Sequence, residues 1–240
     1  MIDTLALYAP EALFVEPYIK AALPGVTICS VDDEAEAAFA LMISSTDIYG
    51  AGAHEDAGED AEIDESSVWK TREDEFCRKV AEKGMKAVVL RCADIVGTGM
   101  TGFMRHLAEG IWRGTFLHFP GNGARRSVVH AVDLGRIACA LADGDVTALE
   151  RTVYNVTDGV NPTLHDLAEA LAVRLGNKRI STLSTGPQQW FGRVVYGRRK
   201  YSMYTTTRTF SSAKLCGELT FSPTPVCEYM RTHNYDENSL

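Results

Sequence analysis

The sequence has 240 residues, of which 45% are hydrophobic and 23% are charged, a composition typical of soluble globular proteins. Its formal net charge of −8 argues against nucleic-acid binding, which depends on a positive surface. No apolar run approaches the roughly 20 residues that cross a bilayer, and the first residues lack the basic and then apolar pattern of a signal peptide. We therefore expect a cytoplasmic protein without a nucleic-acid or membrane partner.

The cysteines indicate the same compartment. None of them forms a CxxC pair or a metal-ligand spacing with histidine, and several lie inside apolar segments. We expect reduced thiols that serve as small apolar side chains, and no bound metal. The six positions are Cys29, Cys77, Cys92, Cys139, Cys216 and Cys227.

Apolar and β-branched runs predict strands that alternate with helices along most of the chain. The predicted strands are 4–9, 26–31, 38–44, 86–92, a short one from residue 127, and 152–158. The predicted helices are 11–23 with a break or kink at Pro17, 69–84, about 101–114, one capped by Asp133, and 163–176. This alternation predicts an α/β fold with a parallel, helix-flanked sheet.

The last quarter of the chain has a different character. Residues 1–176 carry the alternating pattern, whereas 177–240 lose periodicity and gain Pro, Gly, Thr and basic residues. We interpret 177–240 as a smaller, irregular C-terminal lobe that forms one unit with the core. The basic stretch 192–210 meets an anion, forms a solvated loop, or docks on the acidic loop 55–65.

The stretch "ISSTDIYG" (43–50) ends a buried strand in three hydroxyls, Ser44, Ser45 and Thr46. Such hydroxyls commonly satisfy loose backbone groups at a strand end. Alternatively, they mark a site at the carboxyl edge of a parallel sheet, where open α/β folds bind ligands. Both interpretations stay open on this stretch alone.

Several segments together carry a resemblance to a known family. They are "ISSTDIYG", "VVLRCADIVGTGM", "FPGNGARRSVVHAVDLGRIACALA", "YNVTDGVNPTLHDLAEALAVRLG" and "FSSAKLCGELTFSP". In this order, the segments resemble the extended short-chain dehydrogenase/reductase family of NAD-dependent sugar-nucleotide epimerases and dehydratases. The resemblance covers residues 38–225 and implies a Rossmann-like, doubly wound parallel sheet.

The resemblance also implies roles for particular residues. Ser45, with Thr46 beside it, takes the place of the hydroxyl that contacts the reacting oxygen of the substrate. Arg126 takes the place of an arginine that holds the diphosphate of a nucleotide sugar, a role that suits a bidentate guanidinium. Arg125 and His118 are further candidates for substrate binding. NAD or NADP is the implied cofactor, and a homodimer formed through helices such as 69–83 is implied as the assembly.

The sequence departs from the family at the catalytic pair, Tyr-x-x-x-Lys. When Glu75 is aligned with the glutamate that follows this motif, Ser67 stands at the tyrosine position and Thr71 at the lysine position. Lys70 is one residue out of register, which turns a helical side chain by about 100 degrees, and Trp69 could fill the space of the tyrosine. A serine hydroxyl is too weak an acid to replace the phenol.

A second departure lies where the dinucleotide would bind. The first strand is followed by Pro10 and Glu11, and no glycine occurs before Gly25, although glycines normally let the pyrophosphate approach the backbone. Asp32 or Asp33 could still contact the ribose. The chain passes from the second strand to the next within about seven residues, so we expect a sheet shortened on its N-terminal side.

These departures lead to three hypotheses. The first is a family member with a degenerate cofactor site and impaired or lost redox chemistry, which retains a cleft for a nucleotide-sugar-like anion. The second is an active, atypical NAD(P)-dependent sugar-nucleotide epimerase or reductase. The third is an oligomeric or partner-binding scaffold.

Overall fold

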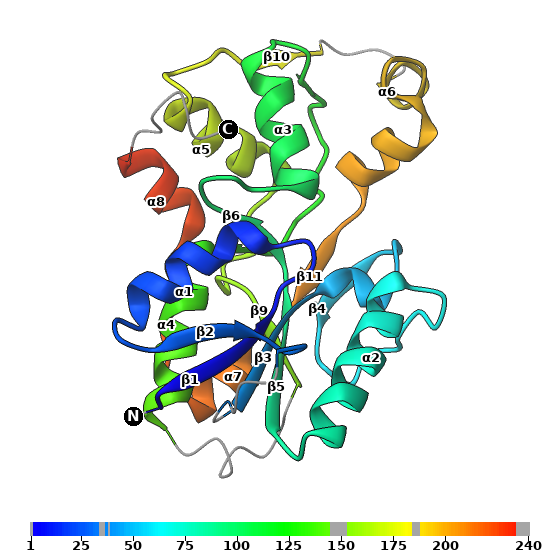
Figure 1. Ribbon diagram of the computed structural model, residues 1–240. Helices are drawn as coiled ribbons and strands as arrows, with labels where there is room; N and C mark the ends of the chain where they lie inside the picture. Colours follow the sequence, from blue (N-terminus) through cyan, green and yellow to red (C-terminus); the bar gives the residue numbers. More distant parts are fainter. Residues whose placement is uncertain (1, 34–36, 38, 145–152, 184–187, 234–240) are drawn as a thin grey trace.

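The computed structural model describes residues 2–33, 37, 39–144, 153–183 and 188–233. Its centre is a parallel sheet of five strands in the order β2-β1-β3-β5-β9 (Figure 1). The strands are β1 (Thr4–Tyr8), β2 (Thr27–Ser30), β3 (Phe39–Ser45), β5 (Lys86–Cys92) and β9 (Val153–Val156). The expected Rossmann-like α/β sheet is confirmed. Residues 38 and 152, which were predicted to begin two of the strands, lie outside the described part.

The sheet is short on the side of β2. A full dinucleotide-binding sheet has the order 3-2-1-4-5-6, whereas here β2 is the edge strand and pairs only with β1 in the described sheet. Leu5 of β1 is flanked by Ile28 on one side and Phe39 on the other. Among the described residues, no outer strand is added between β2 and β3, as the short connection in the sequence predicted.

Helices cover both faces of the sheet (Figure 1). One face is covered by α1 (Glu16–Ala22), which follows the 3₁₀ turn η1 (Leu13–Val15), and by α4 (Ala131–Asp143). The other face is covered by α2 (Val68–Glu82). Alternate strand residues feed the two cores, with Leu41 packed on the α1 and α4 side and Met42 on the α2 side, because successive side chains of a strand point to opposite faces.

Two predicted features of these helices need correction. Pro17 lies in the first turn of α1, a position where proline is tolerated, so it starts this helix and does not kink it. Asp133 does not cap α4. The helix begins at Ala131, and the ring of His130 accepts the capping hydrogen bond from the Val132 amide at 3.3 Å.

A second hydrophobic cluster lies beyond the carboxyl ends of the strands. It contains side chains of α3 (Gly102–Trp112), α5 (Leu164–Arg174), α6 (Gln188–Thr205) and α8 (Val226–Thr232). Two short strands, β7 (Leu117–His118) and β10 (Ser181–Thr182), pair in the same region. The helices α3 and α5 lie before residue 176, whereas α6 and α8 lie after it. This core therefore combines side chains from both sides of the predicted boundary between the core and the C-terminal segment.

The remaining elements connect the sheet to this second cluster. They are η2 (Thr46–Tyr49), β4 (His54–Ala57), β6 (Asp94–Val96), β8 (Val128–His130), β11 (Arg208–Phe210) and α7 (Ala213–Glu218). Strand β11 pairs in parallel with β4, so the last residues of the basic stretch dock on the start of the acidic loop, which is one of the three predicted alternatives. All six cysteines are free, and no helix in the described ranges has the length and apolarity to cross a bilayer.

Candidate functional site

A cavity of about 410 Å³ lies between the sheet and the second hydrophobic cluster. Its sheet side is formed at the carboxyl ends of β1, β3 and β5, which is where open α/β folds bind ligands. Its other side comes from the start of α3 and from the end of α6 with the residues that follow. The lining residues are Glu11, Ala12, Phe14, Ser44, Ser45, Asp47, Ala51, Trp69, Cys92, Ala93, Asp94, Ile95, Thr101, Gly102, Phe103, Arg126, Ser202, Met203, Thr206 and Arg208.

The predicted catalytic hydroxyls differ in their surroundings. Ser45 lines the cavity, and its Oγ accepts a hydrogen bond at 3.1 Å from the amide of Asp47, which caps η2. That bond uses the oxygen as an acceptor and leaves the hydroxyl proton available to a ligand. Thr46 is buried and is not among the lining residues.

Ser44 belongs to a buried polar network that the sequence analysis missed. Its hydroxyl donates to the Glu73 carboxylate of α2 at 2.6 Å, and Glu73 is held by the guanidinium of Arg91 on β5 through bonds of 2.8 to 3.2 Å. Arg91 also donates to the Tyr49 hydroxyl at 3.0 Å, and this hydroxyl donates to Asn155 at 2.8 Å. Burial raises the pKa of Tyr49, against the hydrogen bond from Arg91, which lowers it.

The helical spacing could have identified Glu73. Trp69, Phe76 and Val80 form the buried stripe of α2, and Glu73 falls on that stripe, four residues after Trp69 and three before Phe76. Glu75, on which the alignment was based, is exposed and pairs with Lys79. A polar residue on an apolar stripe was thus the available signal.

The start of α2 carries none of the expected catalytic chemistry. Ser67 caps the helix, accepting from the Trp69 amide at 3.3 Å, and Thr71 is exposed. Lys70 pairs with Asp74 at 2.5 Å. Of these four residues, only Trp69 lines the cavity, and in the described part of the chain that lining includes neither tyrosine nor lysine.

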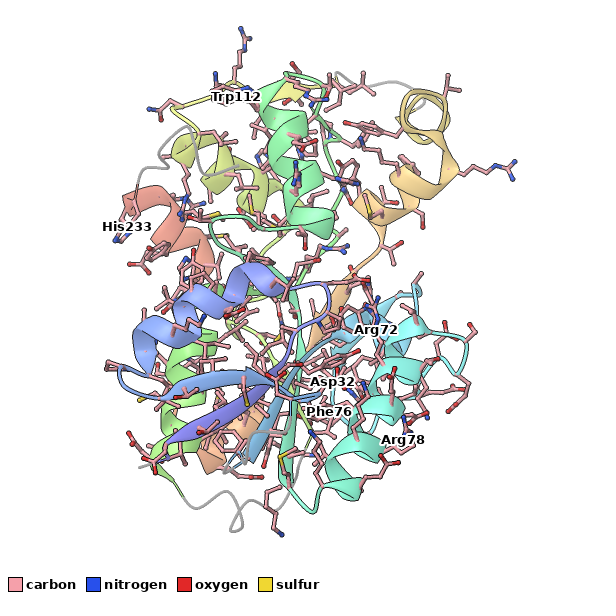
Figure 2. The ribbon with its side chains drawn as sticks, viewed as in Figure 1. Asp32, Arg72, Phe76, Arg78, Trp112 and His233 are labelled. Carbon is pink, nitrogen blue, oxygen red and sulfur yellow. The ribbon has the colours of Figure 1, made fainter. Side chains whose placement is uncertain are left out.

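Charged and aromatic side chains occupy the end of β1. The Glu11 carboxylate binds the guanidinium of Arg72 at 2.6 Å, and that guanidinium lies 4.8 Å from the Trp69 ring centre. Tyr8 stacks on Phe76 with ring centres 5.9 Å apart. Figure 2 shows Arg72 and Phe76 on the side of α2 that faces the sheet. These residues therefore do not provide the exposed glycine backbone that binds a pyrophosphate.

The predicted ribose-binding acids interact with lysines of α2 and its C-cap. The Asp32 carboxylate is 2.7 Å from Lys79 Nζ, and the Lys83 ammonium donates to the backbone oxygens of Val31 and Asp33. The Asp33 carboxylate accepts from the Ser30 amide at 2.7 Å. Neither aspartate lines the cavity.

Arg126 is the predicted substrate-binding residue that reaches the cavity. It is buried, its Nε donates to the Asp94 carboxylate at 2.6 Å, and its Nη1 donates to the carbonyl of Met203 at 3.2 Å. Its guanidinium carbon lies 3.7 Å from the centre of the Phe103 ring. Arg125 is exposed and donates to the Asn161 carbonyl, and His118 stacks on His165; neither lines the cavity.

Arg208 is a second cavity arginine, and no local signal separated it from its basic neighbours. Its Nη1 donates to Asp47 at 2.7 Å and its Nη2 to the Gly50 carbonyl at 2.9 Å. The two arginines that line the cavity are therefore each paired with an aspartate that also lines it. Among the described residues, no group of three or more His, Cys, Asp or Glu side chains is placed to hold a metal ion.

Comparisons with known proteins agree with this fold. Residues 25–157, more than half of the chain, match the NAD dependent epimerase/dehydratase family. No curated protein is similar enough to the sequence to count as a match.

Solved structures with a similar fold include two epimerases and a further enzyme. A UDP-glucose 4-epimerase from Thermotoga maritima, solved with UDP-glucose, is 18% identical at a TM-score of 0.56, covering 90% of this chain and 64% of that one. A UDP-N-acetylglucosamine 4-epimerase from Methanobrevibacter ruminantium, in complex with UDP-N-acetylmuramic acid, is 13% identical at a TM-score of 0.65, covering 96% of this chain and 97% of that one. The enzyme WbmH of Bordetella bronchiseptica, in complex with NAD⁺, is 11% identical at a TM-score of 0.65, covering 97% of both chains. At these identities the likeness shows the fold.

Proposed function

The chain belongs to the NAD-dependent epimerase/dehydratase family, and we propose that it binds a nucleotide-sugar-like anion without performing the redox reaction of that family. In this proposal the substrate side of the cleft is retained. The dinucleotide site and the proton-transferring pair have been replaced by other side chains.

The ion pair between Glu11 and Arg72 is the observation that carries the proposal. These side chains meet at 2.6 Å next to the carboxyl end of β1, where the pyrophosphate of a dinucleotide would need to approach bare backbone. The pairing of Asp32 with Lys79 at 2.7 Å removes the free carboxylate that a ribose would use.

The residues near the reacting position support the loss of redox chemistry. General acid–base catalysis is worth roughly 10²–10⁴-fold in rate, and it requires a group whose pKa suits proton transfer. Ser45 lines the cavity and keeps a hydroxyl proton to donate, but it has no phenol or lysine beside it in the lining. Ser45 would then orient a ligand oxygen by hydrogen bonding.

Arg126 supports the choice of an anionic ligand. Its Nε and Nη1 are fixed by Asp94 and Met203, so the guanidinium is held rigidly in the lining without losing its remaining donors. It stands close to the first turn of α3, which contributes Gly102 and Phe103 to the same cavity, and helix N-termini favour negative charge. A nucleoside diphosphate sugar combines such an anion with hydroxyls that Ser45 can reach.

Calorimetric titration and thermal shift with two sets of ligands test the proposal. We expect stabilisation by UDP-glucose or UDP-N-acetylglucosamine, and none by NAD⁺, NADH, NADP⁺ or NADPH. Arg126→Lys keeps the charge but loses the planar fork, so it should weaken UDP-sugar binding about tenfold or more. Arg125→Lys, at the exposed neighbouring position, is the matched control. Binding of any of the four dinucleotides would refute the loss of the cofactor site and favour an active enzyme.

A further inference from the structure

Two histidines from distant parts of the sequence stack on each other at the outer end of the second cluster. The rings of His118 on β7 and His165 on α5 have centres 4.0 Å apart and planes inclined by 30°. The Nε2 of His165 lies 3.2 Å from the Glu169 carboxylate. Its Nδ1 is buried without a hydrogen-bond partner in the described part of the chain.

The surroundings of His118 favour its neutral ring. Burial lowers the pKa of His118, the neighbouring His165 lowers it further, and Glu169 acts in the opposite direction. On α5, Asp166 is engaged by the hydroxyl of Thr163 at 2.6 Å. The paired strand β10 presents only serine and threonine. Two protonated rings would face each other about 4 Å apart, at which like charges repel appreciably even in a partly hydrated setting.

Strand β7 also holds α6 in place. The Leu117 amide donates to the Tyr196 hydroxyl at 2.5 Å. On the other side of His118, the Phe119 ring makes edge contacts with Tyr196 and Tyr201 of α6, with ring centres 5.8 and 5.7 Å apart. The residues on either side of His118 thus both contact α6.

The far end of α6 borders the cavity. Ser202 and Met203 line it, and the Met203 carbonyl accepts from Arg126 at 3.2 Å. The helix is interrupted at Gly197, whose φ of 74° and ψ of 160° are not helical. A chain of contacts therefore runs from the histidine pair through β7 and α6 to the cavity arginine.

We propose that His118 and His165 form a proton-operated latch that fixes α6 beside the cavity. While both rings are neutral, their stacking holds β7 against α5, and β7 holds α6. When both rings are protonated, their repulsion separates β7 from α5 and loosens α6. The latch acts on the position of α6 whatever ligand the cavity binds, so it can be tested independently of the proposed function.

Hydrogen exchange of the full chain at pH 7.5 and pH 5.0 tests the latch, with protection factors corrected for the intrinsic exchange rates. We expect the amides of 188–205 to lose roughly tenfold in protection at the lower pH. The doubly substituted His118→Gln, His165→Gln protein should lose this dependence, whereas His106→Gln, at an exposed position of α3, should keep it. The same dependence in the doubly substituted protein, or none in the unsubstituted one, would overturn the latch.

A second measurement covers the case in which the double variant folds poorly. The ring signals of His118 are titrated by NMR in the unsubstituted chain and in His165→Gln. We expect the pKa of His118 to rise when the neighbouring ring can no longer become charged. An unchanged His118 titration would show that the two rings do not interact, and would exclude the latch.

Discussion

The buried pair of Glu73 and Arg91 allows a quantitative prediction about stability. The side chains are 8% and 7% exposed, and Arg91 makes three of its hydrogen bonds to Glu73. Replacing Glu73 by Leu removes all three and leaves a buried guanidinium whose remaining partner among the described side-chain bonds is the Tyr49 hydroxyl. Leaving a buried charge uncompensated costs about 3–5 kcal/mol, a large part of the 5–15 kcal/mol that stabilises a typical domain.

The double variant Glu73→Leu, Arg91→Met separates the charge from the packing. It removes both charges and replaces them by apolar side chains, so only the hydroxyls of Ser44 and Tyr49 lose partners. We expect a loss of about 1–3 kcal/mol for these groups, well below the sum of the two single losses. The free energies of unfolding are measured by urea denaturation of all four proteins in a double-mutant cycle.

A surface pair on the same helix is the control. Arg78 and Glu82 are 2.7 Å apart and each 60% exposed, and Figure 2 shows Arg78 on the outer side of α2. Their coupling should stay at about 0.5 kcal/mol or less. If the Glu73 and Arg91 losses simply add, the network does not act as a unit and our reasoning about it is refuted.

Three further predictions concern helix ends and close packing. Burial, and then the charge of Arg174, lowers the pKa of His130 to about 4 from its ordinary 6.5. Because the pKa is lower in the folded protein than in the unfolded one, the neutral ring contributes its full stabilisation above pH 6.5. The free energy of unfolding should then fall by about 3 kcal/mol as the pH drops to 4. His130→Asn can still cap α4, so chemical denaturation from pH 7.5 to 4 should give it a flatter profile, and an equally steep one would contradict the assignment. Gly135→Ala would bring a methyl group within 2.6 Å of the Tyr18 carbonyl, so a loss of about 1–3 kcal/mol in thermal unfolding is expected, against a neutral or favourable effect for Gly217→Ala, where nothing lies within 4 Å. Thr163→Ala removes half of the capping box of α5 and should cost about 1 kcal/mol, with Thr163→Ser as the variant that retains it.

The sequence by itself determined the core strands and the two departures from the family. Residues 87–90 of the predicted strand 86–92 are apolar on both faces, and a strand buried on both faces needs little else to be recognised. The absence of glycine between β1 and Gly25 was equally informative, because the approach of a pyrophosphate depends on local backbone and not on distant partners. Thr163 likewise predicted the start of α5, because a capping box depends on only four consecutive residues.

Only the tertiary structure decided which polar residues share a site. Glu73, Asp74 and Glu75 are consecutive and chemically alike, but only Glu73 is buried. This difference depends on which face of α2 turns toward the sheet and on Arg91 lying opposite Glu73. His54 shows the same limit, since the strand β4 that it starts has no apolar alternation and forms by pairing with β11, more than 150 residues later. Periodicity reports which face of an element is buried, but the partner across a buried contact is set by how the chain folds back on itself.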